Sequence, residues 1–229
     1  MDENISQSAI KFVKSHKKEI KEHFAGDSVC LPDEKPISIF MAGSPGAGKT
    51  EFSKRFLADA KITAVRIDAD EIRDFIPLYN GCNASDVQGG SAIAVEYIYD
   101  YVIKKKKNMI LDATFADYEK SLNNVQRSIN KARHIEIYYL YQDPLVAWKF
   151  TKYRQELEGR IVPKEVFVDS FFKACENANR VKEEFGKQVQ LHIVIKNFEN
   201  GLDKLKLNVD SIDPYVKMIY NRKSLMELL

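Results

Sequence analysis

The middle of the chain alternates short apolar runs with longer stretches in which apolar residues recur every three or four positions. Runs of the first kind are typical of buried strands, and stretches of the second kind are typical of helices with one buried face. The pattern predicts strands at 37–42, 62–67, 108–112, 134–141 and 189–195, and helices at 50–60, 86–105, 117–132 and 164–185.

Strands that alternate with helices in this way indicate parallel βαβ units, whose crossovers are right-handed and whose helices cover both faces of the sheet. The expected fold class is therefore α/β, with a parallel sheet of about five strands. Ligands of such sheets bind beyond the carboxyl ends of the strands. The residues that follow each predicted strand are thus the first place to look for chemistry.

The two ends of the chain carry helical patterns of their own. Apolar residues from Ile5 to Phe24 predict a helix over 5–25, and a connector with Pro and Asp follows at 26–36. We expect three parts: an N-terminal helix and connector at 1–35, a core at 36–196, and a helical C-terminal tail at 197–229 packed on the core. The candidate packing positions of the tail are Ile212, Val216, Ile219, Leu225 and Leu228.

Composition narrows the class of protein. The 229 residues include 35 Lys and Arg against 33 Asp and Glu, and 45% are hydrophobic. This balance excludes disorder over most of the chain and makes a nucleic-acid partner unlikely. The N-terminus lacks a basic region before an apolar run, and no run reaches the roughly 20 residues of a membrane span. We expect a cytoplasmic protein, with Cys30, Cys82 and Cys175 as free thiols.

One motif dominates the chemistry. The segment Gly43–Thr50 fits the pattern G-x-x-x-x-G-K-[ST], directly after a predicted strand and before a predicted helix. Its glycines let backbone N–H groups face one phosphate, Lys49 reaches the β- and γ-phosphates, and Thr50 offers a hydroxyl to Mg²⁺. The fold is therefore expected to be of the P-loop NTPase type, binding ATP and Mg²⁺. The expected ATP-binding residues are Gly43, Ser44, Pro45, Gly46, Ala47, Gly48, Lys49, Thr50 and Glu51.

Carboxylates follow the second predicted strand. Asp68 and Asp70 stand at the sheet edge where the phosphate loop is expected. A carboxylate there can accept the proton of an attacking hydroxyl, and Asp70 is the candidate base. Asp68 is either a substrate contact or the N-cap of the next helix. Arg73 either holds a substrate anion or pairs with a carboxylate.

The third predicted strand ends in Asp112. P-loop proteins place an acid at this point to hold Mg²⁺, so Asp112 is a candidate metal or substrate ligand, and an N-cap is the alternative. Thr114 is either a polar substrate contact or a cap.

A basic segment follows the fourth predicted strand, between Leu145 and Pro163. We interpret it as a lid in which Arg154 and Arg160 stabilise the charge on the transferring phosphoryl group and help to exclude water. The alternative is a solvated helical face, which we prefer for Lys149, Lys152 and Lys164.

Taken together, these segments resemble the zeta toxin kinases, a P-loop group related to chloramphenicol phosphotransferase. The resemblance covers residues 36–185. It rests on Gly43–Thr50, Ile67–Arg73, Ile110–Thr114, Tyr153-Arg154 and Gly159–Phe167.

This resemblance implies transfer of phosphate from ATP to the 3′-hydroxyl of UDP-N-acetylglucosamine, with Asp70 as the base. Arg154 and Arg160 match the family's two lid arginines, at a shorter interval. The family often has Glu-Gly-Thr where this chain has Asp112-Ala-Thr114, one methylene shorter. It also implies a possible antitoxin partner. The helix at 5–25 is then either a cis inhibitor or, as we prefer, a packed helix.

Two other functions remain open from the residues. One is a P-loop kinase for another small-molecule alcohol or for a polynucleotide 5′-hydroxyl. The other is a module that binds ATP without transferring phosphate. A GTPase switch is excluded because the chain has no N-K-x-D motif that would read guanine.

Overall fold

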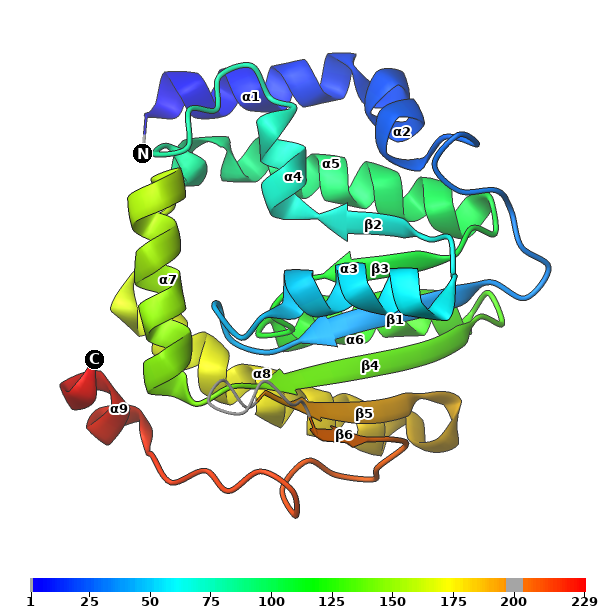
Figure 1. Ribbon diagram of the computed structural model, residues 1–229. Coiled ribbons are helices and arrows are strands. Elements are labelled where there is room, and N and C mark those ends of the chain that lie inside the picture. The colour runs from blue at the N-terminus through cyan, green and yellow to red at the C-terminus, as the bar shows by residue number, and fades with distance from the viewer. Residues whose placement is uncertain (1, 197–203) are drawn as a thin grey trace.

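A computed structural model describes residues 2–196 and 204–229. Their strands form one six-stranded sheet in the order β2-β3-β1-β4-β5-β6, with helices on both sides (Figure 1). The first five strands are parallel, and β6 pairs antiparallel to β5 at the edge. The strands are β1 (Ile37–Ala42), β2 (Val65–Asp68), β3 (Met109–Asp112), β4 (His134–Tyr141), β5 (Gln190–Ile195) and β6 (Lys204–Lys206).

The predicted α/β fold with a mostly parallel sheet is confirmed, with two differences in the strands. The second strand begins at Val65 rather than 62, because Lys61 takes a left-handed conformation and the N–H of Ile62 still donates to Leu57 of the preceding helix. The sixth strand was not predicted. It has three residues and all are exposed, so it carries no alternation of buried and exposed positions.

Helices cover the sheet unevenly. On one face, Phe52, Phe56 and Leu57 of α3 pack on a small apolar cluster. On the other face, α5, α6 and α8 pack on a much larger cluster that includes Phe40, Ile137 and Ile193 of the sheet. These helices are α3 (Lys49–Ala60), α5 (Ala84–Lys104), α6 (Tyr118–Ile129) and α8 (Lys164–Phe185), together with α4 (Ala69–Asp74), α7 (Pro144–Glu158) and the 3-10 turn η1 (Gly186–Gln188).

The N-terminal helix is broken in two. Instead of one helix over 5–25, the chain forms α1 (Glu3–Ser15) and α2 (Lys17–Ala25), because His16 leaves helical geometry and its ring stacks on Phe12. Both helices pack on α5 (Figure 1). The approach is close, since a Cβ at Gly90 would lie 3.1 Å from the carbonyl oxygen of Ala9. The N-terminal helices are thus part of the core packing.

The prediction of a helical tail was wrong for most of its described length. Residues 204–229 hold β6, an irregular segment, and one short helix, α9 (Arg222–Leu228). Asn208 has a positive φ, and Pro214 interrupts the segment, so no continuous helix forms. Residues 197–203 of the predicted tail lie outside the described residues. Of the candidate packing positions, Ile212, Val216 and Leu225 are buried, and Ile219 and Leu228 are exposed.

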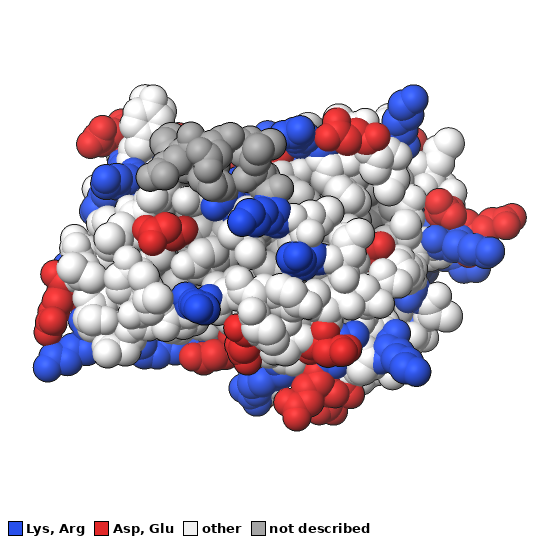
Figure 2. Space-filling view, turned by 60° about the horizontal axis from the view of Figure 1, so that its bottom comes forward, with Lys and Arg blue, Asp and Glu red and all other residues white. Residues whose placement is uncertain are grey.

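Surface features agree with the composition. On the face shown in Figure 2, the described Lys and Arg side chains are interspersed with Asp and Glu and form no continuous basic area. Among the described residues, no helix is both long and apolar enough to cross a membrane. Cys30 and Cys175 are buried thiols and Cys82 is an exposed one.

Candidate active site

The three segments that carry chemistry meet at one edge of the sheet. β2, β3 and β1 are neighbours, so their carboxyl ends bring together Asp68, Asp112 and the loop that begins at Gly43 (Figure 1). Asp68 stands directly opposite Asp112 in the register of the two strands. The topology therefore places these sequence-predicted residues side by side, as expected for a parallel sheet.

The phosphate loop, residues 43–50, has the backbone that its glycines allow. Gly46 and Gly48 take positive φ values of 73° and 83°. A Cβ at Gly46 would collide with the carbonyl oxygen of Ala147 at the start of α7, so the loop lies directly against that helix. The loop leads into the N-terminus of α3, whose backbone dipoles favour an anion.

The phosphate loop encloses the side chain of Lys49. Its Nζ donates to the carbonyl oxygens of Gly43, at 3.0 Å, and Ser44, at 2.8 Å. Burial lowers the pKa of Lys49 to about 8, and the nearby carboxylate of Asp112 opposes that shift. The positive charge of Arg160 also lowers the pKa of Lys49.

Thr50 and Asp112 form a pair of oxygen ligands. Thr50 Oγ1 donates to Asp112 Oδ2 at 3.0 Å, and the Asp112 side chain is 4% exposed. One hydroxyl and one carboxylate suit Mg²⁺, which keeps several waters and completes its shell with phosphate oxygens. Over the described ranges, His, Cys, Asp and Glu side chains form no cluster of three that could hold a metal by themselves. The residues present therefore fit a metal that arrives with a nucleotide.

Asp68 has the structural role that the sequence left open. It is the N-cap of α4, and its Oδ1 accepts a hydrogen bond from the backbone N–H of Asp70 at 2.8 Å. Burial raises the pKa of Asp68, and the negative charges of Asp112 and Asp70 raise it further. The helix that carries Asp70 is thus started and oriented by Asp68.

Asp70 lies in the first turn of α4 and meets three arginines. Arg73 Nη1 contacts Oδ1 of Asp70, and Arg160 Nη1 contacts Oδ2. Arg154 Nη2 is 3.5 Å from the same Oδ2. The Asp70 side chain remains 28% exposed, so the carboxylate is reachable from solvent. Three guanidinium groups around one carboxylate leave positive charge that a second anion can use.

The lid is mostly a helix. Arg154 lies on α7, where it also pairs with Glu158 at 2.9 Å, and Arg160 follows the helix after Gly159, which ends it with a positive φ of 71°. Burial lowers the pKa of Arg160, while Asp70 opposes the shift. Lys152 lies over the Trp148 ring and does not join the site. The two lid arginines converge on Asp70 in spite of their short interval.

Two other predicted residues have local roles. Thr114 accepts the N–H of Gly43 with its carbonyl oxygen, at 3.1 Å, and the N–H of Ala116 with its Oγ1, at 3.4 Å. It therefore fixes the start of the phosphate loop. Glu51 lies exposed in the first turn of α3.

Sequence reasoning missed two polar residues at the site. Gln88 on α5 accepts from Arg73 Nη2 at 2.6 Å, while Arg73 Nε is buried with no hydrogen bond to the described residues. Arg66 on β2 donates to Asp68 and Asp112. The sequence did contain an indication of Arg66, because this charged residue interrupts an apolar strand two positions before Asp68 and on the same face. It contained no such indication of Gln88.

The chain is similar to known proteins in sequence and in structure. The family model for zeta toxin matches residues 21–210. The PezAT chromosomal toxin-antitoxin system of Streptococcus pneumoniae has a similar structure, with a TM-score of 0.62, 15% identity, and coverage of 86% of this chain and 80% of that one. The AvrRxo1-ORF1:-ORF2 complex is similar at a TM-score of 0.63, 12% identity, and coverage of 93% and 70%.

The Pnkp1/Rnl/Hen1 RNA repair complex is also similar, at a TM-score of 0.51 and 18% identity, with coverage of 78% of this chain and 50% of that one. At these identities the structural likenesses establish the fold alone. No curated protein matches the sequence. The family model spans most of the chain, including the second half of α2, the phosphate loop, Asp70, Asp112 and both lid arginines. The chain belongs to the zeta toxin family.

Proposed function

We propose that this chain is a kinase that transfers the γ-phosphate of ATP to a sugar hydroxyl, the 3′-hydroxyl of UDP-N-acetylglucosamine. One observation carries the proposal. A reachable carboxylate, Asp70, lies at the same sheet edge as the phosphate loop and contacts Arg73, Arg154 and Arg160. A base beside concentrated positive charge is what phosphoryl transfer to an alcohol requires.

The nucleotide side of the site follows from the loop. Backbone N–H groups of residues 43–50 and the N-terminus of α3 face the phosphates, and Lys49 leaves its two carbonyl partners to bind them. Mg²⁺ would be held by Thr50 and Asp112, where it supplies positive charge to the transferring phosphoryl group. The shared contact of these two side chains supports this assignment.

Asp70 acts on the acceptor. Its carboxylate takes the proton of the attacking hydroxyl as the new O–P bond forms and the bond between the γ-phosphorus and the bridging oxygen of ADP breaks. The arginines that contact Asp70 hold its carboxylate in position beside the phosphate loop. ADP leaves with the electron pair of the broken bond, so charge is balanced.

Arg154 and Arg160 divide their donors between two partners. Each guanidinium group has five N–H donors, and each uses only part of them on carboxylates in this structure. The remaining donors are free to bind the equatorial oxygens of the transferring group, where charge accumulates. The lid thus links the base and the phosphoryl group.

The choice of sugar substrate has its own support. It is supported by membership of the zeta toxin family and by the anion-rich character of a UDP-sugar, which suits the excess of arginine. Asp68 and Thr114, proposed as substrate contacts, already have structural roles, and this leaves Arg73 and Asp112 as the better candidates. Asp112 reaches one methylene less far than the Glu often found in the family.

The test is phosphate transfer from labelled ATP with Mg²⁺ to UDP-N-acetylglucosamine. We expect Lys49→Ala to abolish transfer and Asp70→Asn to lower kcat by about a hundredfold or more. Asp59→Asn is the matched control, because Asp59 is exposed on α3 and, within the described residues, forms an ion pair only with Arg55. Wild-type turnover in Asp70→Asn would contradict the assignment of the base.

The same assay separates the other functions. ATP binding without transfer to UDP-N-acetylglucosamine would lead to a panel of nucleosides, 5′-hydroxyl oligonucleotides and small alcohols. Transfer to one of these would identify a kinase for another alcohol. No transfer to any would indicate a module that binds ATP only.

We also propose that a separate antitoxin protein inhibits this chain. Membership of the zeta toxin family supports it, and a structural neighbour belongs to a toxin-antitoxin system. The N-terminal helices are poor candidates for a cis inhibitor, since Ala9, Val13 and Ile20 are buried in the core. Wild type should arrest growth of a bacterial host and Asp70→Asn should not. Equal growth with both would contradict the proposal.

A further inference from the structure

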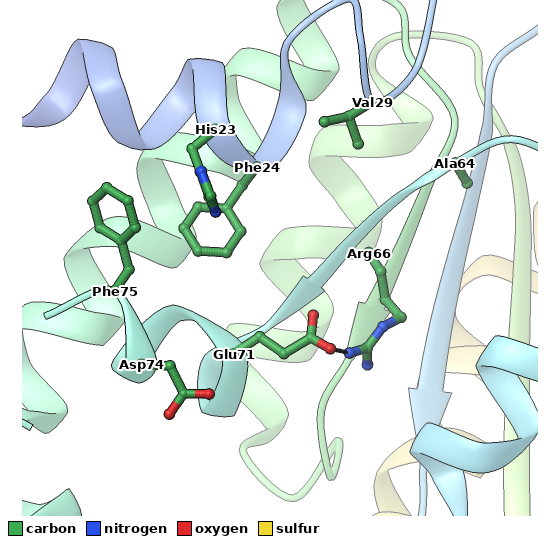
Figure 3. Close-up of a pocket in the computed structure, with 8 residues that line it drawn as sticks. All are labelled: His23, Phe24, Val29, Ala64, Arg66, Glu71, Asp74 and Phe75. Carbon is green, nitrogen blue, oxygen red and sulfur yellow. Dashed lines mark ion pairs between the residues drawn. The ribbon is translucent and has the colours of Figure 1, made fainter. Parts of the chain in front are cut away.

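Arg66 lies between two groups of carboxylates at the edge of the sheet. Its side chain is 10% exposed, and its Nη1 donates to Asp68 Oδ2 at 2.8 Å and to Asp112 Oδ2 at 3.0 Å. On the other side its Nη2 forms an ion pair with Glu71 of α4 (Figure 3). A buried arginine thus connects the expected metal ligand to a carboxylate outside the site.

The contact with Asp112 competes with a metal. The oxygen that accepts from Arg66 is Oδ2, the same atom that accepts from Thr50 Oγ1. Mg²⁺ bound to Thr50 Oγ1 and to Asp112 Oδ2 would need a lone pair that Arg66 now uses. Two cations at hydrogen-bond distance from one oxygen also repel each other strongly where the site is screened from water. Arg66 and a metal therefore compete for Asp112 Oδ2.

A cavity beside Arg66 leaves room for its side chain to move. An open cavity of about 610 Å³ lies beside it, and both Glu71 and Asp74 line that cavity (Figure 3). Glu71 is 44% exposed and already in contact with the guanidinium group. A small shift along this pair would move the positive charge away from Asp112 without leaving it unpaired.

We propose that the Arg66 guanidinium group occupies the metal site when no metal is bound. It neutralises Asp112 and Asp68 before Mg²⁺ binds, and it releases Asp112 by moving toward Glu71. Arg66 thereby sets the affinity for the metal, and Glu71 sets how readily Arg66 yields. The inference rests on the proposed function in one respect, which is that a divalent cation enters with ATP at Thr50 and Asp112.

Removing the two residues has opposite effects on metal binding. Without Arg66, Asp112 loses its competitor and the site becomes more negative, so the metal binds more tightly. Without the charge of Glu71, Arg66 loses its one ion pair with α4 and stays on Asp68 and Asp112, so the metal binds more weakly. A purely structural pair would not give effects of opposite sign.

The experiment measures binding rather than turnover. The probe is a fluorescent, non-hydrolysable ATP analogue, and its Kd is measured in EDTA and in excess Mn²⁺. The Kd in EDTA divided by the Kd in Mn²⁺ reports how strongly the metal and the nucleotide favour each other's binding. This ratio cancels any direct effect of a variant on nucleotide binding. We expect Arg66→Leu to raise this ratio by about tenfold and Glu71→Gln to lower it by about threefold.

Two controls make the result specific. Arg55→Leu removes an exposed arginine of α3 that pairs with Asp59 and should leave the ratio unchanged. In the double variant Arg66→Leu/Glu71→Gln, the ratio should equal that of Arg66→Leu, since Glu71 acts through Arg66. Glu71→Gln changes an exposed side chain, so it keeps the inference testable if Arg66→Leu fails to fold.

The outcomes are distinct. A wild type whose Kd does not change with Mn²⁺ would remove the metal from the proposed function. A wild type that responds to Mn²⁺, with Arg66→Leu unchanged or weakened, would overturn the role of Arg66. An unchanged ratio in Glu71→Gln would overturn the role of Glu71.

Discussion

Asp112 at the end of β3 and Asp70 just after β2 have different surroundings, and the difference supports the different roles proposed for them. Asp112 is 4% exposed and shares one oxygen between Thr50 and Arg66, which suits a ligand for a metal. Asp70 is 28% exposed and is held by three arginines, which suits a base that a substrate can reach. Residue type and spacing could predict that both matter, but only their contacts separate metal ligand from base.

At the residue scale, Gln88 tests how Asp70 is held. Gln88→Leu removes the acceptor of Arg73 Nη2, so Arg73 loses one of the two contacts that aim it at Asp70. We expect kcat to fall by about tenfold with little change in KM for ATP, since a hydrogen bond to a charged group contributes about 1.5–3 kcal/mol. Steady-state kinetics measures this. Gln126→Leu on α6 is the control, and equal kcat in both variants would contradict the prediction.

Gly46 tests the phosphate loop. Gly46→Ala should abolish ATP binding, because its φ is 73° and the new methyl group would collide with the carbonyl oxygen of Ala147. Gly186→Ala is the matched control: it also has a positive φ, but no atom lies within 4 Å of its Cβ position. We expect Gly186→Ala to lose about 1–3 kcal/mol of stability and to keep ATP binding. ATP titration and urea unfolding would check both, and ATP binding by Gly46→Ala would contradict the packing.

At the element scale, periodicity predicted most of the fold because the buried strands and amphipathic helices bury their apolar positions regularly. It failed where geometry changes without a change in pattern. The apolar positions of the N-terminal segment continue through His16, so the break between α1 and α2 left no trace. In the tail, Ile212 and Val216 are buried at helical spacing but on irregular backbone.

The same limit applies to the site. A motif revealed the phosphate loop, and strand ends revealed Asp68, Asp70 and Asp112, because topology alone brings those positions together. The contacts of Gln88 and Arg66 depend on how α5 and β2 are placed next to α4, and a single sequence does not encode that placement visibly.

An anchor between α2 and the sheet supplies the element-scale prediction. Lys107 is fully buried before β3, and its Nζ donates to the carbonyl oxygen of Ala25 and to Asp27 Oδ1, both at 2.7 Å. Asp27→Ala leaves a buried ammonium without its counter-charge, whereas Lys107→Met leaves an exposed carboxylate. We therefore expect Asp27→Ala to lower the free energy of unfolding more than Lys107→Met does. Urea unfolding measures both, and the reverse order would contradict the account.

At the scale of the whole molecule, a third apolar cluster lies at the base of the lid. Ala147 and Trp148 of α7 pack with Phe167 and Phe171 of α8 and with Leu225 of α9. The C-terminal helix thus packs beside the base of the lid (Figure 1). The far end of α7 has exposed apolar side chains, Tyr153 and Leu157. The lid is packed in an apolar cluster at its base, and its far end is held by polar and backbone contacts, including those of Arg154 and Arg160 with Asp70.

Acid stability should depend on His192. This residue is buried on β5, its Nδ1 accepts the N–H of Asn208 at 3.1 Å, and burial lowers its pKa. His134 and Lys182 lower the pKa further, and Glu136 opposes them. Because the unfolded chain binds a proton at higher pH, the free energy of unfolding should decrease as pH falls below about 6.5 toward the folded pKa.

The measurement is urea unfolding at several pH values from 7 downward. His192→Gln should remove part of this slope, and His23→Gln, which changes an exposed histidine, should keep it. The same slope in His192→Gln and wild type would contradict the prediction.

The contact between Gly46 and Ala147 joins the phosphate loop to the base of α7. Under the proposed function, a nucleotide that changed the shape of the loop would press on the base of the helix that carries Arg154. Binding of ATP would then be coupled to the position of Arg154 and Arg160, and we expect ATP to bind before the acceptor.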